Sequence, residues 1–75
     1  MDPDQAMTEL HNEINQFIMN KLQDNHAPLS VAAALITNAL RVYRTVLTEE
    51  DYESVMEMIQ ERRNEVDPYL PSVLQ

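Results

Sequence analysis

The sequence predicts an all-α protein, and three observations lead to this prediction. The 75-residue chain contains no glycine, although average usage would give about five, so tight β-hairpin turns that need positive φ are disfavoured. Aromatic residues are rare, whereas the strong helix formers Ala, Leu, Met, Glu and Gln are abundant. Apolar residues recur at spacings of three and four. We expect a single domain over residues 1–75, folded as a small antiparallel three-helix bundle with an extended C-terminal tail.

The first helix is predicted over residues 3–24. Pro3 suits the first helical position and Asp2 suits the N-cap before it. After the helix, Asn25 is the best available residue for the left-handed conformation that commonly ends helices, and Pro28 prevents the helix from continuing. Its core-facing stripe consists of Met7, Leu10, Ile14, Phe17, Ile18 and Leu22.

The central helix is predicted over residues 28–47, beginning either at Pro28 or one turn later with Ser30 as the cap. Its apolar residues cover roughly half of the helix circumference, which is wider than the stripe of about 100° on an ordinary surface helix. Such a helix needs neighbours on two sides, so we expect two chains to complete the bundle as a homodimer. In order around the helix, the arc consists of Val31, Val42, Leu35, Val46, Ala39, Ala32, Tyr43, Ile36, Leu47 and Leu40.

The third helix is predicted over residues 49–65. Thr48 is a good N-cap, and Asp51 stands at the reciprocal position of a capping box, although aspartate is a weak substitute for glutamate there. Residues 66–75 form the predicted tail, because Pro68 and Pro71 force extended geometry on the residues before them. The tail is nevertheless apolar, so we expect it to lie across its own domain or a sister subunit.

The formal net charge of −8 excludes some partners. It opposes binding to phosphate backbones and to anionic membranes, so we expect neither nucleic acid nor membrane as a partner. The acidic start does not resemble a signal peptide and no apolar run could span a bilayer, which favours a cytoplasmic protein. With Lys21, the chain has only five fixed positive charges. The four arginines are expected to form ion pairs with the excess of carboxylates: Arg41, Arg44, Arg62 and Arg63.

One motif suggests catalysis. Residues 49–53 read EEDYE, and this EExxE pattern resembles the magnesium site of all-helical nucleotide pyrophosphatases of the MazG and dimeric dUTPase type. Carboxylates one helical turn apart can share a hard cation. Those enzymes also need a downstream ExxD, and the sequels here end in Gln60 and Asn64 instead. His11 and His26 lack companions at metal-ligand spacing. We therefore expect no metal, no cofactor, no catalytic residues and no enzymatic activity.

The sequence thus favours a non-catalytic protein-interaction or regulatory module, such as an accessory protein, acting as a small acidic helical homo-oligomer. The alternative is an acidic decoy, in which Glu50, Glu53, Glu57 and Glu61 mimic nucleic acid and inhibit a nucleic-acid-binding protein. A magnesium-dependent pyrophosphatase-like enzyme is the third candidate. The expected partner-binding residues lie on the central helix and the tail: Val31, Leu35, Val42, Tyr43, Val46, Tyr69, Leu70 and Leu74.

Overall fold

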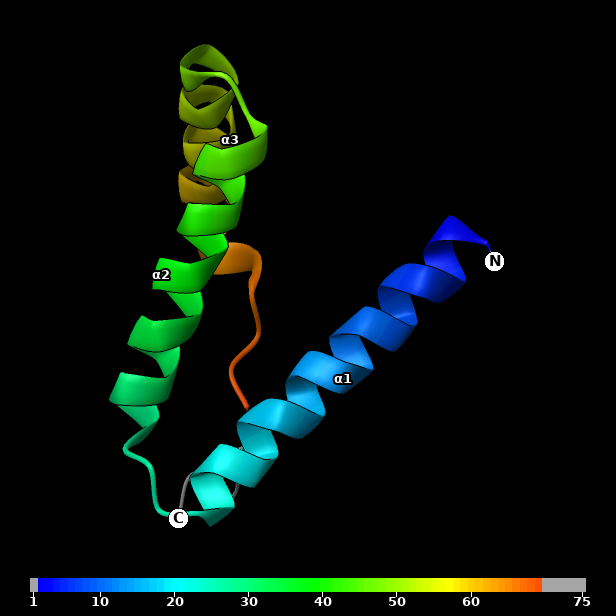
Figure 1. The fold of residues 1–75 in the computed structure, drawn as a ribbon, viewed down its shortest axis with the longest axis vertical. Helices are drawn as coiled ribbons and strands as arrows, with labels where there is room; N and C mark the ends of the chain where they lie inside the picture. The colour runs from blue at the N-terminus through cyan, green and yellow to red at the C-terminus, as the bar shows by residue number, and fades with distance from the viewer. Residues whose placement is uncertain (1, 70–75) are drawn as a thin grey trace. The chain divides into compact units, whose positions relative to one another are not determined.

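The computed structural model describes residues 2–69 and confirms the all-α prediction. Over this range the chain forms α1 (Pro3–Gln23), α2 (Pro28–Val46), α3 (Glu49–Arg62) and the short 3-10 helix η1 (Arg63–Glu65), and no strand (Figure 1). The chain divides into two compact units, residues 1–33 and residues 34–75, and α2 runs from the first into the second. Whether a second chain completes the bundle stays a prediction.

Both ends of α1 are held by local hydrogen bonds. The extended Asp2 residue caps the start, because its carboxylate accepts a bond of 3.1 Å from the Asp4 N–H. At the other end Asn25 adopts φ 68°, as its position predicted. The Asn25 N–H donates to the Leu22 carbonyl at 3.2 Å, and the His26 N–H donates to the Lys21 carbonyl at 3.1 Å. This pair of bonds is a Schellman motif, with asparagine where glycine is usual.

Helix α2 begins at Pro28, the earlier of the two starts that the sequence allowed, and it ends one residue before the predicted boundary. The first hydrogen-bonded N–H of α2 is that of Val31, which donates to the Ala27 carbonyl at 3.0 Å. A proline at the first position sacrifices no hydrogen bond, since that N–H has no intrahelical acceptor in any helix. The chain then leaves α2 at Leu47, whose N–H still donates to the Tyr43 carbonyl at 2.9 Å.

Helix α3 starts on the predicted cap. The Thr48 hydroxyl oxygen accepts from the Asp51 N–H at 3.1 Å, and three acidic residues occupy the first turn, where the helix dipole favours negative charge. The Asp51 carboxylate returns no bond to Thr48, because an aspartate side chain is too short to complete the capping box. The end of the predicted 49–65 segment tightens into the 3-10 helix η1, after which Val66 is extended.

Unit 34–75 is built on a helical hairpin in which α3 runs back beside the last turns of α2 (Figure 1). Tyr52, on the first turn of α3, is the one residue of the described range that is buried, at 9% exposure. The Arg44 guanidinium of α2 stacks over its ring, 4.3 Å from the centroid. The same hairpin also contains half-buried apolar side chains of α2, of the turn and of α3, namely Leu40, Tyr43, Leu47, Val55 and Met56.

Candidate functional site

A row of large apolar side chains on α1 is exposed. Met7, Leu10, Ile14 and Phe17, which we term the α1 stripe, are 55%, 50%, 43% and 51% exposed. They follow one another at spacings of three and four residues and therefore share one face of the helix. Only towards the end of α1 does the same face become half-buried, at Ile18 and Leu22. An amphipathic helix of this length normally buries such a face, so the α1 stripe is a candidate contact surface.

The partner-binding residues predicted on α2 fall into two groups. Val31, Leu35 and Tyr43 are half-buried, whereas Val42 and Val46 are 62% and 69% exposed. The exposed pair therefore remains available to a partner, together with Ile36 from the same apolar arc. In the predicted tail, Tyr69 is exposed, and Leu70 and Leu74 lie outside the described residues.

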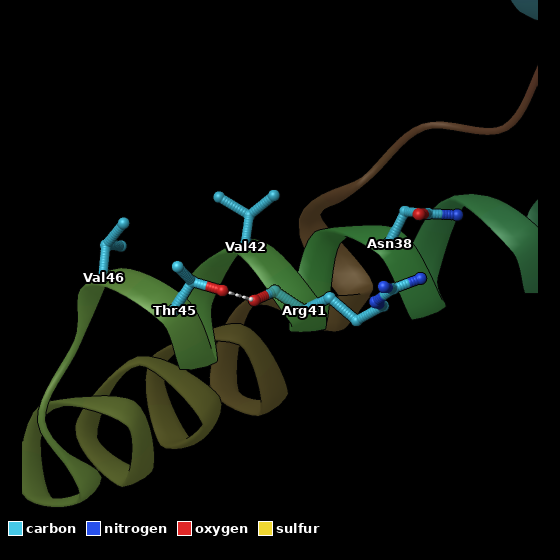
Figure 2. A pocket seen from close by; sticks show the side chains of 5 residues that line it. All are labelled: Asn38, Arg41, Val42, Thr45 and Val46. Carbon is cyan, nitrogen blue, oxygen red and sulfur yellow. Dashed lines mark hydrogen bonds between the residues drawn. The ribbon is translucent and has the colours of Figure 1, made fainter.

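Beside the exposed valines lies a shallow groove of about 390 Å³, which we term the α2 groove (Figure 2). All of its lining residues come from successive turns of one helix, so it is a strip along the surface of α2 and not a cavity between helices. Valine side chains form one edge, and the Arg41 guanidinium lies on the other. Its lining consists of Asn38, Arg41, Val42, Thr45 and Val46.

The polar side chains in the middle of the groove are bonded to their own helix. The Asn38 side-chain amide donates to the Ala34 carbonyl at 2.8 Å, and the Thr45 hydroxyl donates to the Arg41 carbonyl at 2.8 Å. Bonds of this kind, back to the carbonyl four residues earlier, are common for side chains in helices. Because these two bonds lie within α2, covering the groove would leave the Thr45 hydroxyl and one Asn38 N–H bonded.

Electrostatically, α2 differs from its neighbours. It contains Arg41 and Arg44 and no Asp or Glu, whereas α3 begins with three acidic residues. The expected ion pairs of the arginines are not formed within residues 2–69. Arg44 stacks on Tyr52 instead, and the exposed Arg41 guanidinium is left without a carboxylate partner among the described residues. The α2 groove is therefore apolar along one edge and cationic along the other.

The groups considered for catalysis do not assemble into a metal site over the described range. Glu49, Glu50 and Glu53 are exposed on the first turns of α3, beside the Thr48 cap. His11 and His26 are also exposed. Nowhere in residues 2–69 do three His, Cys, Asp or Glu side chains come close enough to hold a metal ion. The acidic row of the decoy hypothesis is exposed on α3: Glu50, Glu53, Glu57 and Glu61.

Sequence reasoning missed two parts of this site. The period of the α1 stripe is that of any core-facing helix, so the sequence alone predicts a core face and gives no sign that it is exposed. Asn38 and Thr45 carried no apolar signal, although their spacing of seven residues on one helix face could have placed them beside Val42.

None of the helices in residues 2–69 combines the length and the apolar character needed to cross a bilayer. No protein-family model matches the chain, and no curated protein sequence or solved structure is significantly similar to it.

Proposed function

We propose that this chain is a non-catalytic protein-interaction module that acts as a small, acidic, helical homodimer. The observation that supports this proposal most strongly is the exposure of apolar faces on α1 and α2 in a chain where Tyr52 is the one buried residue of the described range. Monomeric soluble proteins rarely leave large contiguous apolar patches uncovered, and such patches commonly mark protein contacts.

Burying the exposed apolar side chains would release a free energy of the order that dimerisation needs. Fully burying one large aliphatic or aromatic side chain is worth about 1.5–3 kcal/mol, so covering one that is half exposed is worth about 1 kcal/mol. Covering seven such side chains on each of two chains would supply about 14 kcal/mol, of the same order as the estimated 4–15 kcal/mol cost of association. These side chains are Met7, Leu10, Ile14, Phe17, Ile36, Val42 and Val46.

Co-expression of two differently tagged copies tests self-association directly. We expect the second copy to be recovered when the first is captured through its tag, and we expect an excess of untagged chain to reduce that recovery by exchange. Tagged chains mixed with an unrelated acidic helical protein of similar size serve as the control. Recovery of the captured copy alone, at every expression level, would contradict the proposal.

A further inference from the structure

We infer that the α2 groove of one chain holds helix α1 of a second copy, with the α1 stripe covering Val42 and Val46 and with Glu13 paired to Arg41. This inference rests on the proposed homodimer and specifies which surfaces meet in it. Three properties of the two surfaces lead to it: their lengths, their charges, and the polar groups between them.

The two surfaces match in length. The α1 stripe extends from Met7 to Phe17, which at 1.5 Å per residue corresponds to about 15 Å along the helix axis. The α2 groove extends from Asn38 to Val46, which corresponds to about 12 Å. A helix laid along the groove would therefore span it from end to end and place part of its apolar row over Val42 and Val46.

Glu13 and Arg41 carry opposite charges at the borders of the two surfaces. Glu13 lies three residues after Leu10 and four before Phe17, so it borders the α1 stripe on the helix surface. Arg41 borders the α2 groove opposite the valines, is exposed, and has no carboxylate partner within residues 2–69. Of the two directions in which α1 can lie along the groove, the inference selects the one that turns the Glu13 edge towards the middle of the groove, across which the long Arg41 side chain can reach.

Part of the polar lining of the groove is already hydrogen-bonded. The Asn38 amide and the Thr45 hydroxyl already donate to carbonyls of their own helix, each at 2.8 Å. Loss of water from a polar group is costly mainly when the group is left without a partner. The Thr45 hydroxyl and one Asn38 N–H therefore stay hydrogen-bonded under a second helix, whereas the other Asn38 N–H, the Asn38 Oδ1 and the Arg41 guanidinium need partners from that helix or from water.

A second copy of this chain can occupy the α2 groove, so no other protein is needed as the partner. The chain itself contains the complementary element, an exposed apolar row with an acidic border. In a two-fold symmetric dimer the contact occurs twice, because α1 of each chain lies on α2 of the other. The dimer therefore contains two pairs of Glu13 with Arg41, one at each contact.

Charge reversal with mixing in trans tests this assignment. The variants R41E and E13K each place like charges together at both contacts of their homodimer, and we expect each to raise the dimer Kd by about tenfold or more. In an equimolar mixture of R41E and E13K, the heterodimer has one contact with the original pair of Glu13 and Arg41. At its other contact both charges are reversed, so opposite charges meet there too. We therefore expect the mixture to dimerise with a Kd within about threefold of wild type.

Matched control variants make the same changes of charge on α3, away from the proposed contact. R62E and E57K alter exposed residues of α3 by the same charge, and we expect each to stay within about twofold of the wild-type Kd. If R41E behaves like R62E while the wild type dimerises, the groove assignment is overturned and the proposed homodimer stands. If the double variant R41E/E13K is restored but the mixture is not, the groove holds α1 of its own chain, and the inference is overturned. A wild type that remains monomeric would overturn the proposed function itself.

Discussion

Replacing Ile14 by aspartate should abolish self-association. Ile14 is 43% exposed in the single chain and stands in the middle of the α1 stripe, so a carboxylate there would be desolvated without a partner in the dimer. The lost apolar burial and the cost of the unpaired charge amount to about 3 kcal/mol per site, and each dimer contains two sites. We expect the dimer Kd to rise by more than about 100-fold, measured by sedimentation velocity over a dilution series.

The control for this substitution lies on α3. Met58 is exposed to a similar extent, 46%, but belongs to neither the α1 stripe nor the α2 groove. Met58→Asp makes the same change of chemistry, and we expect it to leave the Kd within about threefold of wild type. Equal weakening by both substitutions would show that the α1 stripe has no special part in the contact.

Replacing Tyr52 by alanine should unfold the α2–α3 hairpin to a large extent. Tyr52 is the one buried side chain of the described range, and the Arg44 guanidinium stacks on its ring at 4.3 Å. Removing a buried aromatic ring costs about 3–5 kcal/mol, which is a large part of the 5–15 kcal/mol that stabilises a typical domain. Urea unfolding followed by circular dichroism at fixed protein concentration measures this loss.

Tyr52→Phe separates the ring from its hydroxyl. Phenylalanine keeps both the apolar burial and the face on which Arg44 stacks, so we expect a loss of less than about 1 kcal/mol. If alanine and phenylalanine destabilised the protein equally, the stability of the hairpin would not depend on the ring.

The sequence predicted the helices and their caps well because these depend on neighbouring residues. Asp2 and Thr48 cap α1 and α3 as expected, and Asn25 takes the left-handed conformation that glycine would usually occupy. Each of these features is decided by the chemistry of a few successive residues. The third helix was expected to continue to residue 65, but its last residues form a 3-10 helix instead. Such tightening is common at helix ends.

The partners of individual side chains could not be predicted in the same way. Arg44 stacks on Tyr52 where we expected an ion pair, and which group an arginine meets on the following helix depends on how the hairpin packs. The α2 groove likewise depends on the rotamers of Asn38 and Thr45, which turn back to their own helix. A helical period shows which residues share a face, but it does not show what covers that face.

The molar mass of the wild-type chain in solution, measured by sedimentation equilibrium, tests the central claim most directly. We expect a mass of twice 8.7 kDa at about 100 µM, falling towards the mass of one chain on dilution as mass action requires. A mass of 8.7 kDa at every concentration up to that limit would contradict the claim that a second copy covers the exposed faces of α1 and α2.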